Sequence, residues 1–86
     1  MLELTIEQIQ YLKAVIDFGS FEKAANETTK TKTAIIYSIK KLEENLGFDL
    51  LDRSGYRVVP TIKGIEFLNH SKSLLKEYEK LLSVAK

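Results

Sequence analysis

The chain has 86 residues, of which 44% are hydrophobic, so it is long enough for one small folded domain and too apolar to be disordered. It has no cysteine and one histidine, so we expect no disulfide, no metal site and no cofactor, and the composition suits a reducing cytoplasm. No apolar run is long enough to span a membrane, and the N-terminus lacks the basic and apolar parts of a signal peptide.

The net charge of +1 is spread unevenly along the chain. Residues 1–29 carry two basic and five acidic groups, residues 30–63 carry seven and four, and residues 64–86 carry four and three. The middle third therefore has a net charge of +3, while the first third has −3. This small asymmetry favours a contact between the middle third and an acidic partner such as nucleic acid.

Two helices are predicted in the first third of the chain. The stretch Thr5-Ile6-Glu7-Gln8 fits a capping box, in which two side chains each accept from the other residue's backbone N–H. The first helix should run from residue 6 to 18 and end at Gly19, because glycine adopts the left-handed conformation of a C-cap without strain. Ser20 can then cap a second helix over residues 21–28.

The segment over residues 31–47 is predicted to be one helix with two unlike faces. Its apolar residues recur at steps of four, three and four and form a buried stripe: Ile35, Ile39, Leu42 and Leu46. The opposite face should carry Thr33, Ile36, Tyr37, Lys40 and Lys41. A short helix, a turn and a helix with such a polar face match the helix-turn-helix outline, whose second helix enters a DNA major groove. An ordinary amphipathic helix with a solvated face is the alternative.

A small hairpin is predicted after this helix. Residues 56–59 have the aromatic and β-branched content of a strand, Ser54-Gly55 is typical of a tight turn, and Pro60 should end the strand. Arg53 and Arg57 would then lie near the tip of the hairpin, where they either contact phosphate oxygens or are simply solvated.

Thr61 should cap a long last helix that runs from residue 62 to near residue 85, with Gly64 as a slight weakness in its first turn. Its apolar residues follow a coiled-coil-like spacing and extend further than so small a domain needs. This seam predicts a homodimer through the helix, with folding back onto its own domain as the alternative. The residues expected at the dimer interface are Phe67, Leu68, Leu74, Leu75, Tyr78, Leu81 and Leu82.

Three stretches together resemble one known family. They are Phe18-Gly19-Ser20-Phe21 with Ala24-Ala25, the run IKKLEENLG over residues 39–47, and Leu50-Leu51-Asp52-Arg53 followed by Val58-Val59-Pro60-Thr61 and Gly64. In order and spacing they are similar to the N-terminal DNA-binding domain of LysR-type transcriptional regulators, over nearly the whole chain.

The resemblance implies a mainly α fold: a winged helix-turn-helix with a three-helix core and a short two-stranded wing over residues 1–60, and a linker or dimerisation helix over residues 61–86. It implies sequence-specific binding of double-stranded DNA by a homodimer in the cytoplasm, without enzymatic activity. It also implies that a full regulator senses a small-molecule effector through a C-terminal domain, which is absent from this chain. We therefore expect either a piece of a longer regulator or a small stand-alone relative, and favour the piece.

With the helix over residues 31–47 in the major groove, the candidates for base-edge contact are Lys32, Thr33, Ile36 and Tyr37. The candidates for phosphate contact are Ser20, Lys30, Thr31, Lys40, Arg53, Arg57 and Thr61. The family usually has glutamine at the position of Lys32 and serine at that of Ile36. Because these departures fall where DNA is read, the operator sequence stays open.

Three other functions stay open on the sequence alone. The strongest is a winged-helix module that binds proteins and has lost DNA binding, which Ile36 and the small net charge favour. An enzyme is disfavoured, because the chain offers no nucleophile–base pair and no metal-ligand set. A membrane-surface helix is disfavoured too, because Glu77 and Glu79 are mixed with the lysines of the last helix.

Overall fold

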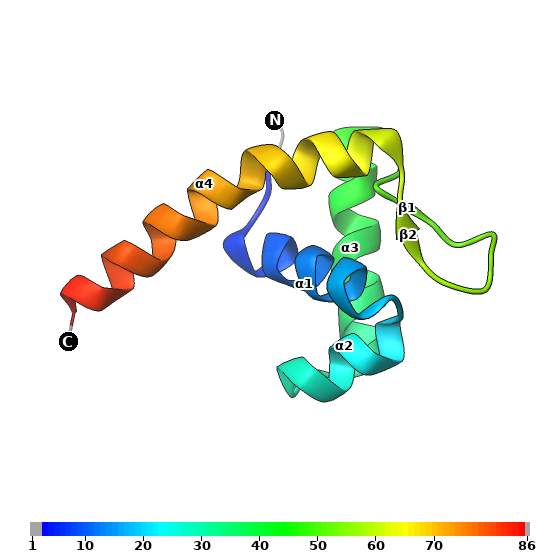
Figure 1. The fold of residues 1–86 in the computed structure, drawn as a ribbon, viewed down its shortest axis with the longest axis horizontal. Coiled ribbons are helices and arrows are strands. Elements are labelled where there is room, and N and C mark those ends of the chain that lie inside the picture. Colours follow the sequence, from blue (N-terminus) through cyan, green and yellow to red (C-terminus); the bar gives the residue numbers. More distant parts are fainter. Residues whose placement is uncertain (1–2, 86) are drawn as a thin grey trace.

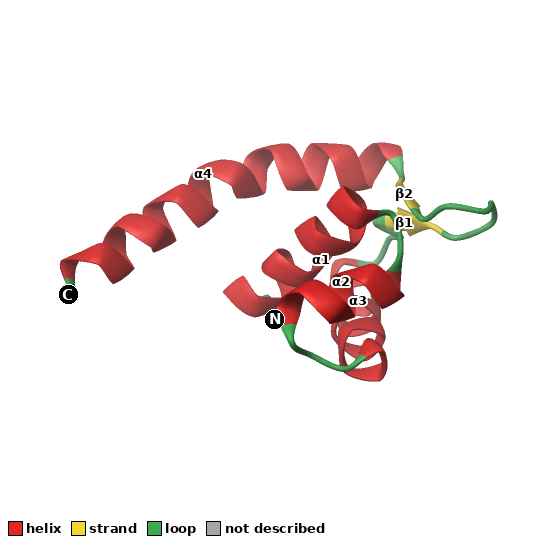
Figure 2. Cartoon of the chain, turned by 60° about the horizontal axis from the view of Figure 1, so that its bottom comes forward, coloured by secondary structure: helices red, strands yellow, loops and turns green. Residues whose placement is uncertain are grey.

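The computed structural model describes residues 3–85 as a bundle of three helices with a small wing and a long fourth helix (Figure 1). The elements in chain order are α1 (Ile6–Phe18), α2 (Phe21–Thr28), α3 (Lys32–Leu46), β1 (Leu51–Asp52), β2 (Val59–Pro60) and α4 (Ile62–Val84). Helices make up most of the chain, and the two strands form one small sheet (Figure 2). The mainly α winged helix-turn-helix expected from the sequence is confirmed.

The helix ends follow from the local sequence as predicted. The Gln8 N–H donates to Thr5 Oγ1 and the Thr5 N–H donates to Gln8 Oε1, which completes the capping box of α1. Gly19 and Gly47 end α1 and α3 in the left-handed conformation, with φ of 75° and 83°. These capping residues set the helix bounds within a residue or two of the predicted ones.

The hydrophobic core lies between α1, α2 and α3, with β1 at one side. Ile35, Ile39 and Leu42 of α3 are fully buried, as predicted, while Leu46, the last residue of the predicted stripe, is half-buried against the core. They pack with buried residues of the other elements: Tyr11, Leu12, Val15, Phe21, Ala24, Leu50 and Leu51. Since α3 is held along its inner side by the whole core, its outer side has a fixed orientation.

The wing has shorter strands and a longer loop than predicted. The antiparallel register pairs Leu51 with Pro60 and Asp52 with Val59. Residues 53–58 form the loop, so the predicted strand over residues 56–59 with a two-residue turn is wrong, although the strand does end at Pro60 as predicted. One cause is that the Val58 N–H donates to the Gly19 carbonyl, 3.1 Å away, and cannot also extend the hairpin ladder.

A second cause of the longer loop lies at Asp52. Its carboxylate accepts hydrogen bonds from the Ser54 hydroxyl at 2.6 Å and from the Ser54 N–H at 2.9 Å. These two bonds favour the ionised carboxylate and hold the pKa of Asp52 below its usual value. The turn therefore begins at Asp52, the first residue of the stretch Asp52-Arg53-Ser54-Gly55 that the sequence indicates as a turn.

The first half of α4 covers the core and the second half leaves the domain (Figures 1 and 2). Gly64, Ser71 and Leu75 are buried along the first half, and Phe67 packs against the core. Beyond Leu75, none of the described residues of α4 is buried. The helix therefore does fold back onto its own domain, but only over its first half.

Gly64 has a more important role than the weak helix position that the sequence suggests. A Cβ built on Gly64 would overlap the Leu50 carbonyl oxygen, which also accepts a hydrogen bond from the Thr61 N–H at 3.0 Å. Only glycine lets α4 begin so close to the backbone before β1. Helix propensity depends only on the helix itself and therefore gives no sign of this contact.

Candidate nucleic-acid interface

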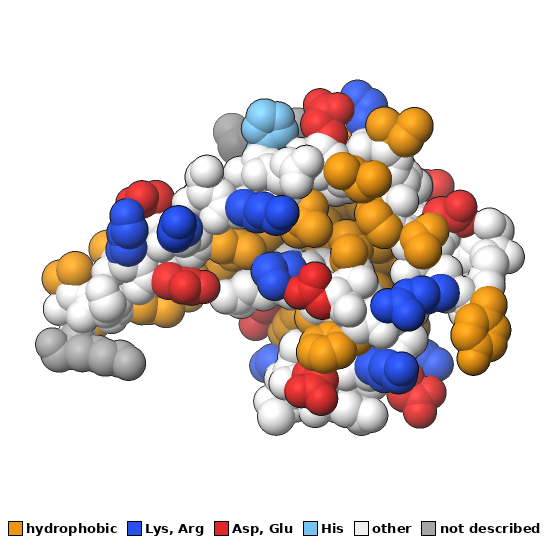
Figure 3. All heavy atoms as spheres, viewed as in Figure 1, with side chains coloured by type: hydrophobic (Ala, Val, Ile, Leu, Met, Phe, Trp, Pro, Cys, Tyr) orange, Lys and Arg blue, Asp and Glu red, His pale blue; other side chains and the backbone are white. Residues whose placement is uncertain are grey.

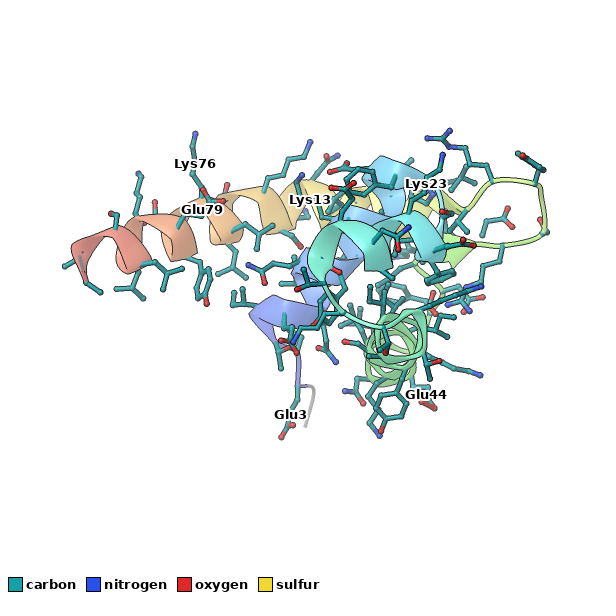
Figure 4. The ribbon with its side chains drawn as sticks, turned by 90° about the horizontal axis from the view of Figure 1, so that it is seen from below. Glu3, Lys13, Lys23, Glu44, Lys76 and Glu79 are labelled. Atoms are coloured by element: carbon teal, nitrogen blue, oxygen red, sulfur yellow. The ribbon has the colours of Figure 1, made fainter. Side chains whose placement is uncertain are left out.

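The outer face of α3 is the candidate surface for DNA. Opposite the buried stripe, the side chains of Thr33, Tyr37 and Lys40 are exposed, and Tyr37 has 68% of its surface accessible. Figure 4 looks nearly along α3 and shows this helix at the edge of the molecule. A helix face that is exposed and backed by a rigid core can enter a groove without rearrangement of the domain.

Ile36 does not lie on the outer face, contrary to the expectation from the sequence. It is half-buried and packs against the core. At about 100° per residue, Ile36 is little more than a quarter turn from the buried Ile35, whereas Thr33 and Tyr37 are about half a turn from it. Only the exposed part of the Ile36 side chain is therefore available for a base-edge contact.

The N-terminal half of α3 is the positive part of this face. Lys30 and Lys32 are exposed, and the first turn of α3 contains no acidic residue. The helix macrodipole adds positive potential at this end, since the N–H groups of the first turn have no helical partner. The acidic residues of α3 are Glu43 and Glu44, near its C-terminal end, where Glu44 is labelled in Figure 4.

Two predicted phosphate ligands, Ser20 and Thr31, are helix N-caps. Ser20 Oγ accepts a hydrogen bond from the Lys23 N–H, and Thr31 Oγ1 accepts one from the Ala34 N–H, each at 3.1 Å. These bonds use the oxygen lone pairs, so each hydroxyl hydrogen can still be donated to a phosphate oxygen.

The hydroxyl of Thr61, by contrast, is fully engaged. It donates to the Asp49 carbonyl at 2.7 Å and accepts from the Gly64 N–H at 2.9 Å. A phosphate could receive its hydrogen only if the bond to Asp49 were broken. The geometry therefore does not favour the phosphate contact that the sequence analysis assigned to Thr61.

The turn between α2 and α3 contains a strained residue. Thr29 ends α2 with φ of 59°, and among residues 3–85 it is the single non-glycine residue at positive φ. This conformation costs a β-branched residue of order 1–2 kcal/mol. The angle between α2 and α3 is therefore imposed by their shared core and not by the preference of the turn itself.

Arg53 does not lie near the tip of the wing, contrary to the prediction. Its guanidinium is 3.4 Å from Glu43 Oε1 and 4.8 Å from the ring centre of Phe21. It thus joins the base of the wing to α3 and α2. Because 38% of the Arg53 side chain is still exposed, a phosphate can approach the guanidinium. The guanidinium would then bind the phosphate and the Glu43 carboxylate at the same time.

Arg57 lies against the corner between α1 and α2. A Cβ built on Gly19 would be 2.5 Å from Arg57 Nε, so the guanidinium occupies space that only a glycine at residue 19 leaves free. This contact and the Val58–Gly19 hydrogen bond hold the wing loop beside the start of α2. Two predicted phosphate ligands, Ser20 and Arg57, therefore come from neighbouring segments.

Glu43 connects α3 to the wing, a role that the sequence analysis missed. Its side chain is 11% exposed. Its Oε2 accepts hydrogen bonds from the backbone N–H of Leu50 at 2.7 Å and of Leu51 at 3.1 Å, while Oε1 faces Arg53. These partners lie seven to ten residues further along the chain, beyond the reach of any local sequence pattern.

Two exposed residues were also not singled out from the sequence. Ala34 lies in the first turn of α3, and Tyr56 is fully exposed in the wing loop. Their position beside the predicted candidates Thr33 and Arg57 is the only signal that could have identified them. In Figure 1 the wing projects beside α3, on the side opposite to the free end of α4.

The predicted dimer seam of α4 divides into two parts. Leu75 is 9% exposed and Phe67 packs on the core, so these two residues are engaged within their own chain. The other seam residues are half-buried or exposed: Leu68, Leu74, Tyr78, Leu81 and Leu82. A dimer interface along α4 would therefore have available Tyr78, Leu81 and Leu82 beyond Leu75, with Leu68 and Leu74 before it.

An open groove of about 520 Å³ separates α4 from α1. Figure 3 shows apolar side chains in the hollow below α4, with lysine and acidic side chains on its rims. Lys76 and Glu79 extend from α4 on the side on which Lys13 extends from α1 (Figure 4). The mixed charges of this groove distinguish it from the positive half of α3.

Within residues 3–85, no helix is long and apolar enough to cross a membrane. Over the same residues, His, Asp and Glu side chains form no group of three that could hold a metal ion.

Known proteins with similar sequences identify the family. The family model described as "Bacterial regulatory helix-turn-helix protein, lysR family" matches residues 6–65, from the start of α1 into the first turn of α4. The chain belongs to the LysR family. It is the DNA-binding domain of a LysR-type regulator, and the expectation that it is not an enzyme is confirmed by membership of a family of transcription regulators.

Two curated relatives illustrate how much of a regulator this chain spans. The probable HTH-type transcriptional regulator YhaJ of Escherichia coli (strain K12) is 38% identical over 82 residues, which are 95% of this chain and 28% of that protein. A probable RuBisCO transcriptional regulator of Cyanophora paradoxa is 39% identical over 74 residues, which are 86% of this chain and 23% of that protein. The chain thus spans less than a third of the length of these relatives.

Solved structures of proteins with similar sequences have the same fold. The BenM DNA-binding domain in complex with catB site 1 DNA superposes with a TM-score of 0.89 at 29% identity, over 95% of this chain and 92% of that one. OxyR of Corynebacterium glutamicum in its oxidized form superposes with a TM-score of 0.91 at 28% identity, over 98% of this chain and 27% of that one.

Proposed function

We propose that this domain binds double-stranded DNA sequence-specifically as a homodimer, with the N-terminal half of α3 in the major groove. One observation carries the proposal: α3 is buried along one side and presents an exposed turn on the other, rich in lysine and hydroxyl groups and free of acids. The similarity to the BenM domain, whose structure is a DNA complex, supports it.

Within this proposal, exposure divides the residues by role. Lys32, Thr33 and Tyr37 contact base edges, and Ile36 contributes only the exposed part of its side chain. The phosphate ligands are Lys30, Thr31, Lys40, Ser20 and Arg57, with Arg53 joining them by sharing its charge with Glu43. Thr61 has a structural role.

The proposal also includes a homodimer through the distal half of α4 and a division at residues 60 and 61 between the DNA-binding unit and the linker helix. Two copies joined in this way would hold their α3 helices roughly 34 Å apart, on successive major grooves. Effector sensing and a cytoplasmic location also stay predictions. Effector sensing would belong to the further domain that the greater length of the relatives indicates.

The DNA-binding proposal predicts a steep dependence of affinity on salt. We expect fluorescence anisotropy with a labelled duplex of mixed sequence to show binding that weakens linearly on a log–log plot against salt concentration. Lys32→Ala and Lys40→Ala should each weaken binding several-fold. Loss of a lysine that contacts a phosphate should also lower the slope of this log–log plot by about one unit. The matched control is Lys72→Ala, an exposed lysine of α4, which should leave both quantities unchanged. Absence of binding by the folded protein at low salt would contradict the proposal.

The dimer proposal predicts that the distal half of α4 sets the oligomeric state. In sedimentation velocity, the parent should be a dimer, and Leu81→Glu combined with Leu82→Glu should make it monomeric, because charges would replace apolar contact area. Ser73→Glu adds a charge at an exposed polar position of the same helix and serves as the control. A parent that stays monomeric at every concentration tested would refute the dimer.

The protein-interaction module is the second candidate function. Its main support from the sequence was an aliphatic residue on the presumed DNA-reading face. That support is weaker in the structure, because Ile36 is partly used by the core. A folded dimer without affinity for duplex DNA would favour this alternative.

A further inference from the structure

The exposed side chains at the start of α3 offer a narrow set of chemistries. Every residue from 30 to 34 is exposed, and Tyr37 follows one turn later. This set contains no Asn, Gln or Arg, so it lacks the amides that pair with adenine through two hydrogen bonds and the guanidinium that prefers guanine. It contains no Asp or Glu to accept from the cytosine amino group. Four kinds of group remain: lysine ammonium groups, hydroxyls, methyl groups and the aromatic ring of Tyr37.

The methyl groups belong to Thr33 and Ala34, the second and third residues of α3. Ala34 is exposed although it is apolar and adjoins the fully buried Ile35. Both side chains are short: alanine ends at Cβ, and threonine ends at the two atoms bonded to Cβ. The helix backbone can therefore approach a base pair closely at this point. The Ala34 N–H donates to Thr31 Oγ1, which fixes this first turn against the N-cap.

Building on the proposed DNA-binding function, we propose that the methyl groups of Thr33 and Ala34 contact the C5-methyl groups of thymines in the major groove. Thymine is the one base with an apolar group on its major-groove edge, and alanine and threonine methyl groups are suited to contact it. The operator half-site is therefore specified in part by thymine methyl groups, through Thr33 and Ala34, beside the base-edge contacts proposed for Lys32 and Tyr37.

The size of the effect follows from the burial of one methyl group. Removal of a single buried methyl group lowers affinity about fourfold. Deoxyuridine in place of thymidine removes this methyl group and leaves every hydrogen-bonding group of the base pair unchanged. The ratio of affinities for thymine and uracil duplexes thus isolates the methyl contact from phosphate contacts and from the overall stability of the domain.

The test begins with selection of binding sites by the parent domain from a pool of duplexes with a random central region. In the selected duplex, each thymidine is then replaced in turn by deoxyuridine, and the dissociation constant is measured by anisotropy. We expect about fourfold weaker binding at one or two thymines of each half-site. Cytosine in place of thymine at such a position should weaken binding. 5-Methylcytosine at the same position restores the C5-methyl group and should recover part of the lost affinity.

Variants then assign the contacts to residues. Thr33→Ser removes the methyl group and keeps the hydroxyl. The ratio of the affinities for the thymine and uracil duplexes should then fall to one at the single base that Thr33 contacts. Thr33→Val keeps a methyl group and should keep the ratio. Ala34→Gly should abolish the ratio at a different position, with circular dichroism to establish that the helix is intact.

The outcomes separate the two levels of the hypothesis. If the parent binds the selected duplex and its uracil versions equally, or if the variants keep the parent's ratios, the methyl contacts are refuted while DNA binding stands. If the folded parent selects no duplex and binds no DNA at low salt, the proposed function itself is refuted.

Discussion

Gly64→Ala is expected to destabilise the domain by about 3 kcal/mol, the upper end of the usual range for overpacking. The added Cβ would overlap the Leu50 carbonyl oxygen, which is backbone and is already bonded to the Thr61 N–H. Neither group can move without displacing β1 or the start of α4. Helix propensity alone predicts the opposite sign, since alanine is favoured over glycine inside a helix by about 1 kcal/mol.

Thermal unfolding followed by circular dichroism can measure this effect. For a domain of this size, a loss of about 3 kcal/mol corresponds to a fall in Tm of roughly 12–24 °C. All samples need the same protein concentration, because dimerisation makes Tm concentration-dependent. The matched control is Gly55→Ala, since a Cβ at Gly55 has no neighbouring atom within 4 Å and its Tm should change little. An unchanged or raised Tm for Gly64→Ala would refute the close contact between α4 and Leu50.

Glu43→Ala is expected to cost about 3 kcal/mol of stability, because it leaves two backbone N–H groups without an acceptor. Those groups belong to Leu50 and Leu51, which are both buried, and the Arg53 guanidinium loses its partner as well. Glu43→Gln should cost less, about 1 kcal/mol, since an amide oxygen can still accept from the backbone while the charge facing Arg53 is lost.

Urea unfolding of the parent and the two variants gives the free energies for this comparison. Glu44→Ala is the control: it removes the same side chain from the next position of α3, where it is exposed, and should change stability by no more than about 0.5 kcal/mol. If Glu43→Ala and Glu44→Ala were equally mild, Glu43 would be a solvated residue and not the connection between α3 and the wing. A loss of DNA affinity by Glu43→Gln at preserved stability would add a role for Glu43 in positioning the wing.

Both predictions concern contacts that local sequence patterns do not reveal. Gly64 was predicted to be a weak point of a helix, and Glu43 was given no role of its own. The structure gives each a partner in the Leu50–Arg53 segment, from a different direction. The same segment thus connects α3, the wing and α4, and it positions the wing next to the proposed DNA-binding helix.

The errors at the wing have a related physical origin. Turn chemistry and β-propensity predicted a tight hairpin with two arginines at its tip. The hydrogen bond from Val58 to Gly19 and the pairing of Arg53 with Glu43 override those preferences, because both are formed with residues distant in sequence. An arginine that the sequence pattern assigns to phosphate binding can therefore be bound to side chains of its own chain in the fold.

The four helices and their ends follow from local sequence, because N-cap side chains, left-handed glycines and apolar periodicity act within a few residues of one another. Local sequence also determines which side of α3 faces the core, and hence most of the candidate DNA-binding surface. Three other features arise from contacts between elements: the half-burial of Ile36, the bonding of Arg53 and Thr61 within their own chain, and the division of α4 into a packed and a free half. These features depend on contacts between elements that are distant in the sequence. Such contacts produce no periodic pattern of residues from which they could be predicted.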